Sequence, residues 1–158
     1  MDERIVMNTG PLIALARIDA LEIIGSLPFG FVAPAEVCAE LRAGEQQGHL
    51  PAIPGWLREC VVGAPLSAVA VSLLDAGEAA VIQLALEQNI SRVCIDEWKG
   101  RRAACSAGLN VIGTLGLIGL AKARHIIPAM RPYVEKALAV GIYYDLELLE
   151  EVLQAAGE

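Results

Sequence analysis

A small set of acidic residues and one Asn stand where a parallel α/β fold brings side chains together. Asn8 and Asp96 each follow a short apolar segment with the pattern of a buried strand, and Glu97 comes directly after Asp96. Glu40 and Glu78 fall on segments with helical patterns. Ligands of open parallel sheets bind outside the carboxyl ends of the strands. Carboxylates gathered there repel one another, so the set favours a shared hard cation such as Mg²⁺ or Mn²⁺.

Such a cation, held by a few carboxylates, keeps bound water molecules, lowers their pKa and stabilises charge on a phosphate. This is the chemistry of phosphodiester hydrolysis. Covalent nucleophilic catalysis is disfavoured because neither His49 nor His125 lies in a Ser/His/Asp or Cys/His context. The sequence also has no phosphate-binding loop, which disfavours a nucleotide binder. The widely spaced cysteines predict buried free thiols rather than a zinc site: Cys38, Cys60, Cys94 and Cys105.

Each acidic residue also has a structural interpretation. Asp75 and Glu78 have the spacing of a helix capping box. Glu40 suits an exposed helical position, Asp96 suits the N-cap of the following helix, and Glu97 suits its first turn because of the helix dipole. No residue of the set identifies a function singly, whereas their order and placement together favour a metal site.

The overall charge opposes a nucleic-acid partner, but its distribution does not. The chain has 158 residues, of which 55% are hydrophobic and 20% charged, which indicates one folded domain and excludes a disordered chain. The net charge is −7, yet residues 99–144 carry seven basic residues and one acid, and residues 145–158 carry five acids and no base. The basic block is therefore a candidate surface for a phosphodiester backbone.

Three basic residues of this block follow Asp96 within two helical turns: Lys99, Arg101 and Arg102. They are close enough in sequence to contact phosphates near a metal ion. For Arg101 and Arg102 the structural alternative is ion pairing with neighbouring acids. Trp98 suits packing beside the sheet more than stacking on an unpaired base, although both remain open.

Alternating strand and helix patterns predict a parallel sheet that is covered on both faces. Apolar runs predict strands over residues 4–7, 29–32, 56–62, 91–95 and 109–112. Helical spacing and capping residues predict helices over residues 9–18, 19–26, 35–43, 66–74, 75–87, 97–107, 115–124, 128–140 and 146–156. Residues 44–54 have the composition of an exposed loop. No segment is a convincing membrane span, and the first residues lack the pattern of a signal peptide.

Four segments carry distinctive motifs: residues 8–16, 74–79 (Leu-Asp-Ala-Gly-Glu-Ala), 95–102 (Ile-Asp-Glu, then Gly-Arg-Arg) and 111–116 (Val-Ile-Gly-Thr-Leu-Gly). Together they resemble the motifs of the PIN-domain superfamily, and most closely those of its bacterial and archaeal subgroup known as the domain of unknown function 3368. The resemblance covers nearly the full chain. It implies an α/β fold, a three-layer α/β/α sandwich with a central parallel sheet of about four to five strands. It also implies an acidic pocket for a divalent metal and ribonuclease activity, often as the toxin of a type II toxin–antitoxin pair similar to the VapC toxins.

The resemblance assigns the metal-site positions to Asn8, Glu40, Glu78 and Asp96, with Glu97 as a further carboxylate. Glu40, Glu78 and Asp96 are the expected catalytic residues. Asn8 departs from the family pattern, because PIN nucleases generally have Asp there. An Asn carbonyl can bind Mg²⁺ but brings no negative charge, so we expect a lower metal affinity.

The substrate-binding positions implied by the resemblance are hydroxyl and basic residues around the same pocket. Thr9 and Thr114 match small hydroxyl positions that orient a water or a phosphate. The expected contacts to the RNA backbone are made by Lys99, Arg101 and Arg102.

We therefore expect a PIN-like domain over residues 1–144, with an acidic C-terminal helix over residues 145–158 that packs on it or extends from it. The leading hypothesis is a cytoplasmic Mg²⁺- or Mn²⁺-dependent endoribonuclease, a homodimer with a cognate antitoxin as a partner and no contact with a membrane. The alternative is a weakly active or non-catalytic PIN-like module that binds protein or RNA, with a metal site degraded by Asn8. A small-molecule or nucleotide binder is a weaker third hypothesis.

Overall fold

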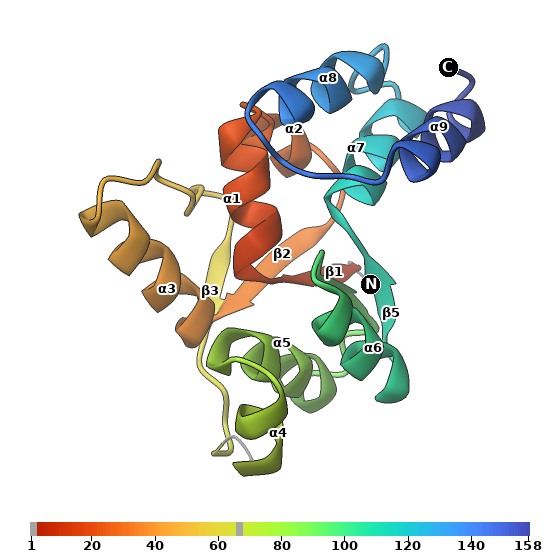
Figure 1. Ribbon diagram of the computed structural model, residues 1–158. Helices are drawn as coiled ribbons and strands as arrows, with labels where there is room; N and C mark the ends of the chain where they lie inside the picture. The colour runs from red at the N-terminus through yellow and green to blue at the C-terminus, as the bar shows by residue number, and fades with distance from the viewer. Residues whose placement is uncertain (1–2, 66–67) are drawn as a thin grey trace.

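The computed structural model describes residues 3–65 and 68–158, and within these ranges five parallel strands form one sheet in the order β3-β2-β1-β4-β5 (Figure 1). The central strand, β1 (Arg4–Met7), is flanked by β2 (Gly30–Pro34) and β4 (Arg92–Cys94). The outer strands are β3 (Arg58–Cys60) and β5 (Asn110–Ile112). Every predicted strand is present: β1 has the predicted bounds, β2 begins one residue later and ends two residues later than predicted, and β3, β4 and β5 are shorter than predicted.

Strand β1 is apolar because both of its faces are covered. Ile5, Val6 and Met7 are completely buried, as expected for the middle of a parallel sheet with helices on both sides. Met7 pairs in register with Cys94, and Cys94 pairs with Ile112. Three neighbouring strands therefore end at the same level, and the residues that follow them share one edge of the sheet.

The strand order changes direction at β1. From β1 the chain moves outward through β2 to β3, and it then returns to place β4 on the other side of β1. Such a switch in direction opens a crevice at the carboxyl ends of the two diverging strands. Asn8 follows β1 and Asp96 lies just beyond β4, so the fold places these two residues on either side of the switch point.

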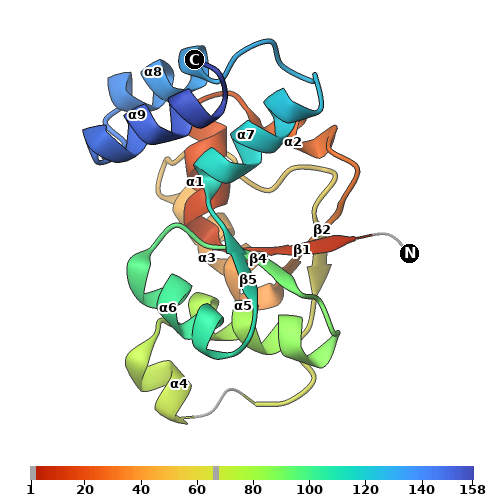
Figure 2. The ribbon, with the colours of Figure 1, turned by 90° about the vertical axis from the view of Figure 1, so that its right-hand side faces the viewer.

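The helices form two layers around the sheet (Figure 2). One layer contains α1 (Thr9–Arg17), α2 (Leu21–Gly25), α7 (Thr114–Ala123), α8 (Arg131–Ala139) and α9 (Leu146–Ala155). The other contains α4 (Ala68–Leu73), α5 (Ala76–Glu87) and α6 (Trp98–Ser106), while α3 (Ala35–Gln46) packs against both α1 and α5. The predicted three-layer α/β/α sandwich is confirmed. No helix in the described ranges is long and apolar enough to cross a membrane.

Most helix boundaries in the described ranges lie within two residues of the prediction, and two differ by three residues for identifiable reasons. Helix α3 continues to Gln46, because Glu45 and Gln46 are good helix formers, and it ends before Gly48, which has φ +95°. The predicted loop over residues 44–54 was therefore wrong for its first residues. Helix α8 begins at Arg131 rather than at residue 128, since Pro132 occupies its first turn. The start of the predicted helix 66–74 lies outside the described residues.

The C-terminal segment is bound to the domain by both apolar and ionic contacts. Leu149 and Leu153 of α9 are buried in the main hydrophobic core. The Glu158 carboxylate accepts hydrogen bonds from the backbone N–H groups of Met130 (2.7 Å) and Arg131 (3.0 Å). It also pairs with Lys122 of α7 at 2.9 Å. Glu158 therefore neutralises part of the basic block and joins the start of α8 to α7.

We predict that Glu158→Gln lowers the melting temperature at neutral pH. The Met130 N–H and the Lys122 ammonium lower the pKa of Glu158 from 4.5 to about 2, because both favour the ionised carboxylate. The resulting stabilisation is present above pH 4.5 and is lost as the pH falls toward 2. Thermal unfolding of both proteins across this range should show a gap that closes on acidification. Glu151→Gln, an exposed position on α9, is the control, and an equal effect of the two substitutions would contradict the prediction.

Candidate metal centre

Asn8 and Thr9 lie at the junction between β1 and α1. Asn8 is only 7% exposed and occupies the N-cap position of α1, but its side chain makes no capping hydrogen bond to the described backbone. The Asn8 amide group is therefore free of hydrogen bonds to the described backbone at the start of α1. The Thr9 hydroxyl donates instead to Oε2 of Glu40 at 2.9 Å. Two residues that are 31 positions apart in the chain are joined at the sheet edge.

Glu40 projects from α3 toward the beginning of α5. A Cβ atom added at Gly77 would lie 2.3 Å from Oε1 of Glu40 and 3.4 Å from Oδ1 of Asp75. The first turn of α5 thus comes against the Glu40 carboxylate, and it can do so because residue 77 has no side chain. Glu40 itself is exposed, so it faces solvent in the open part of the site.

Glu78 uses its two carboxyl oxygens differently. Its Oε1 accepts from the Asp75 N–H at 3.3 Å, and the Asp75 side chain accepts from the Glu78 N–H at 2.7 Å, which completes a capping box. Its Oε2 is buried and has no hydrogen-bond partner among the described residues. The predicted capping box is present, and it leaves the second oxygen available to a ligand.

The surroundings of Glu78 favour its neutral form when no cation is bound. The side chain is only 4% exposed, and burial raises its pKa from 4.5 to about 8, with further increases from the carboxyl groups of Glu97 and Asp75. A Cβ atom at Gly100 would lie 2.6 Å from Oε2, so Gly100 makes the space that this oxygen occupies. Two neighbouring carboxylates repel each other when both are ionised, and either a proton on one of them or a metal ion between them removes this repulsion.

Asp96 joins the end of β4 to the start of α7. Its Oδ1 accepts from the Thr114 N–H at 2.8 Å, and its Oδ2 accepts from the Thr114 hydroxyl at 2.6 Å. The alternative that Asp96 caps the next helix is wrong, because Glu97 is the N-cap of α6 and Asp96 binds the first residue of α7 instead. Thr114 is therefore a residue that orients Asp96.

The residues at this edge fit a divalent ion that is held mainly through water. The described ranges contain no group of three or more His, Cys, Asp or Glu side chains arranged to hold a metal ion. Mg²⁺ normally keeps several waters and takes only one or two protein carboxylates. The unpartnered Oε2 of Glu78 is a suitable acceptor-only oxygen for such an ion.

The structure joins the predicted positions in two groups. Thr9 and Glu40 form one group against the start of α5, which carries Glu78. Asp96 and Thr114 form the other, at the β4–β5 side. Glu97 lies between them through its interaction with Glu78.

The basic residues of α6 flank this acidic edge in different ways. Arg101 turns inward, and its Nη1 donates to the Ile95 carbonyl oxygen at 2.8 Å. The Arg102 guanidinium lies 4.8 Å from the ring centroid of Trp98, and Trp98 is 63% exposed. The preference for a packed Trp98 was wrong, because the indole faces solvent. Neither Arg101 nor Arg102 forms an ion pair within the described part of the chain.

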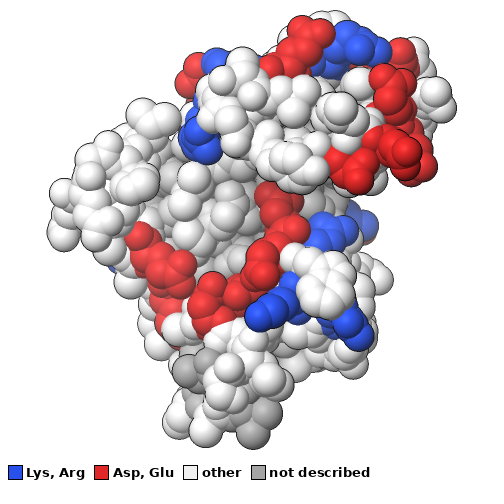
Figure 3. All heavy atoms as spheres, viewed as in Figure 1, with Lys and Arg blue, Asp and Glu red and all other residues white. Residues whose placement is uncertain are grey.

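The surface of this face shows how the charges are arranged (Figure 3). A band of acidic side chains crosses the hollow between α3 and α6, and basic side chains lie beside it over α6. The basic residues of α6 thus lie beside the acidic band, whereas Lys122 and Lys136 of the basic block pair with Glu158 and Asp19 elsewhere.

Three residues at the site were not identified from the sequence. Gly77 and Gly100 give the carboxyl oxygens of Glu40 and Glu78 their space, and Tyr144 lies near Asp96. The glycines sit inside motifs that were recognised, in the sequences Ala-Gly-Glu and Lys-Gly-Arg, so the signal was present. Tyr144 lies in a segment without a recognised motif. It reaches the site because the C-terminal segment packs beside Asp96, which the sequence does not show.

We predict that Gly100→Ala destabilises the protein by about 1–3 kcal/mol, the usual effect of overpacking a filled site. The added methyl group would meet Oε2 of Glu78 at 2.6 Å and Cγ2 of Ile95 at 2.9 Å. Urea unfolding measures the change. Gly10→Ala is the control, since a Cβ at Gly10 meets no described atom within 4 Å, and we expect it to change stability by less than about 0.5 kcal/mol. Equal stabilities of the two variants would contradict the prediction.

Comparison with known proteins supplies the family. The family model of DUF3368, described as a PIN domain, matches residues 4–158. A search of curated proteins finds no significant match. PIN domains have a nuclease-type fold and typically use divalent metals, in agreement with the parallel sheet and the acidic edge described above. Because the match extends over almost the whole chain, the protein belongs to the DUF3368 family of PIN domains.

Proposed function

We propose that the protein is a divalent-metal-dependent endoribonuclease that hydrolyses RNA phosphodiester bonds with Mg²⁺ or Mn²⁺. The observation that carries the proposal is the buried Oε2 of Glu78, which has no hydrogen-bond partner in the described ranges and belongs to a side chain that interacts with the Glu97 carboxyl group. A purely structural carboxyl group at this depth would be expected to have both of its oxygens hydrogen bonded.

In this proposal Glu78 and Asp96 hold the ion, with Asn8 and Glu97 as additional oxygen donors. When bound, the ion supplies a water of lowered pKa and neutralises charge on the phosphate. Thr114 holds Asp96 in place through two hydrogen bonds, and Thr9 does the same for Glu40 through one. Glu40, exposed at the edge of the site, is in a position to accept a proton from a water molecule.

The surface beside the acidic edge supports RNA as the substrate. Lys99 and Arg102 are exposed on α6 and suit contacts with phosphates. The exposed Trp98 ring, already stacked with Arg102, suits stacking on an unpaired base. Single-stranded RNA has both phosphates for the basic side chains and unpaired bases that can stack on the Trp98 ring.

The proposed cellular role is that of the toxin in a type II toxin–antitoxin pair in the cytoplasm, acting as a homodimer and held inactive by a cognate antitoxin. This role rests on the family resemblance of the motifs. A short adjacent gene for an antitoxin would support it, and a gene standing alone would favour a housekeeping ribonuclease.

The second candidate function is a non-catalytic PIN-like module that binds RNA or protein. Asn8 favours it, because the position nearest the switch point brings an amide rather than a charge. The described residues also contain no ready cluster of three ligating side chains.

We predict that the purified protein cleaves RNA with Mn²⁺ or Mg²⁺ and loses this activity in EDTA. Glu78→Gln and Asp96→Asn should each reduce the rate by at least about 10- to 100-fold, the effect seen when residues that support a metal are removed. Glu45→Gln, an exposed position on α3 that follows Glu40, is the matched control. Cleavage that persists in EDTA, or that both variants retain, would rule out the proposal.

We predict that Asn8→Asp raises the affinity for Mn²⁺, because it adds a negative charge beside the other carboxyl groups. Calorimetric titration of the metal-free protein measures the affinity without relying on RNA cleavage. Asn110→Asp adds the same charge at the opposite end of the sheet, where β5 begins, and should leave the affinity unchanged. If neither the natural protein nor Asn8→Asp binds Mn²⁺, the non-catalytic alternative is the better description.

A further inference from the structure

A cavity of about 540 Å³ opens beside Asp96, between the end of β5, helix α7 and the C-terminal segment. Its walls include Asp96, Arg101, Gly113, Tyr143, Tyr144 and Leu148. Asp96 belongs to the candidate metal centre as well, so the cavity and the metal centre share one side chain. This volume is within the usual range for small-molecule sites, about 300–1,000 Å³.

We propose that this cavity is a nucleotide subsite, which holds the base and phosphate of the nucleotide next to the phosphodiester bond that is cleaved. The proposal rests on the proposed ribonuclease function, because the position of the cavity next to Asp96 places it along the path of a bound strand. It adds a substrate site, formed by the C-terminal segment, to the metal centre.

The walls match the chemistry of a nucleotide. Tyr143 is 89% exposed and offers a ring on which a base can stack. Leu148 and Val152 of α9 form an apolar wall. Tyr144 also lines the cavity, and its phenol can both donate and accept hydrogen bonds at the edge of a base.

Arg101 supplies the positive charge for a phosphate. One of its N–H groups is bonded to the Ile95 carbonyl oxygen, and this fixes the guanidinium at the wall of the cavity. A guanidinium has five N–H donors, so donors remain for an anion. No ion pair occupies Arg101 in the described ranges. The side chains of an apolar peptide would offer no acceptor to the remaining N–H groups of Arg101, which favours the nucleotide as the occupant.

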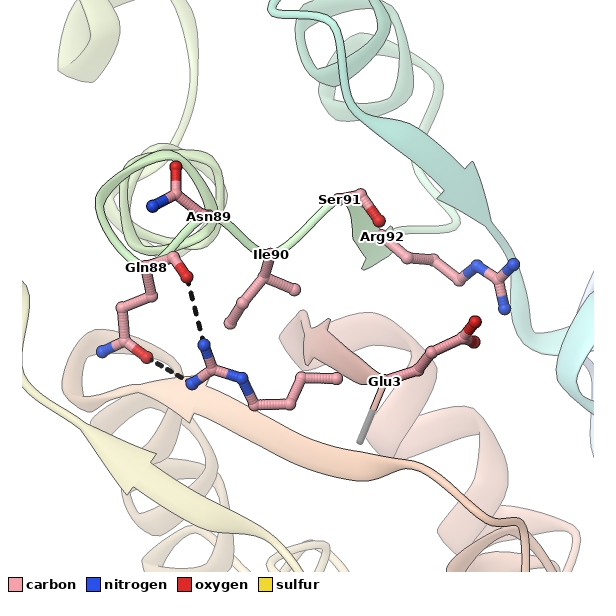
Figure 4. Close-up of a pocket in the computed structure, with 7 residues that line it drawn as sticks. Glu3, Gln88, Asn89, Ile90, Ser91 and Arg92 are labelled. Carbon is pink, nitrogen blue, oxygen red and sulfur yellow. Dashed lines mark hydrogen bonds between the residues drawn. The ribbon is translucent and has the colours of Figure 1, made fainter. Parts of the chain in front are cut away.

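The cavity at the opposite edge of the sheet provides a contrast (Figure 4). Its walls include Glu3, Gln88 and Arg92, together with Arg4. There the Arg4 guanidinium donates to Oε1 of Gln88 at 2.8 Å and to the Gln88 carbonyl oxygen at 3.1 Å, so it ties β1 to the end of α5. Among the described residues no aromatic ring lines that cavity, and it lies at the amino ends of the strands, away from the acidic edge.

The test uses nucleoside 5′-monophosphates and the full chain in EDTA, so that binding does not depend on a metal. In NMR titrations of isotope-labelled protein, we expect the amide signals of Gly113, Gly116 and Tyr144 to shift. Tyr143→Ala should weaken binding at least about fivefold, the lower end of the contribution of a base–aromatic stack. Leu146→Ala is the matched control, because Leu146 is also exposed in the C-terminal segment but does not line the cavity. Both side chains face solvent, so neither substitution should disturb folding.

Three results would overturn the inference: no binding of any of the common nucleoside monophosphates at millimolar concentration, equal affinities of Tyr143→Ala and Leu146→Ala, or equal affinities for ribose 5-phosphate and the nucleotides. RNA cleavage with Mn²⁺, measured on the same preparations, separates this inference from the proposed function. Nucleotide binding without cleavage would refute the ribonuclease and keep the nucleotide site. Cleavage with unchanged nucleotide binding by Tyr143→Ala would do the reverse.

Discussion

The candidate site depends on the burial of one carboxyl group, that of Glu78. One oxygen closes the capping box at the start of α5, and the other is left without a partner in the described ranges, against Gly100 and near Glu97. The fold tolerates this arrangement only when a proton or a cation balances the charge. Helix α6 can approach the Glu78 carboxyl group because residue 100 has no side chain. The same glycine therefore permits the close packing of α6 and the burial of the carboxyl group.

Most of the fold was predictable because its signals are local. The apolar run at Ile5 to Met7 predicts a strand covered on both faces, and the spacing of Asp75 and Glu78 predicts a capping box; both are confirmed. The start of α8 was predicted at Pro128, and this was wrong. A second proline, Pro132, lies four residues later and occupies the first turn of the helix instead. Proline is favoured in the first turn of a helix, and this preference alone does not distinguish Pro128 from Pro132.

The contacts of the site side chains were less predictable, because they join segments distant in sequence. Asp96 has the local pattern of a cap for α6, yet it binds Thr114, which is 18 residues away. Arg101 and Arg102 are adjacent in sequence, but one turns to the Ile95 carbonyl oxygen and the other lies over the Trp98 ring. Periodicity places a residue on a helix, whereas only the neighbouring elements decide which partner its side chain finds.

The strand order also determines when the acidic edge forms during synthesis. Strand β1 meets β2 early, but its other neighbour, β4, is made only after residue 91, and Asp96 is held by a residue made later still. Pairing between such distant segments is slow compared with local structure. A chain translated only as far as β4 therefore carries Asn8, Glu40 and Glu78 without Asp96 and Thr114. The acidic edge therefore cannot be complete before Thr114 has been synthesised.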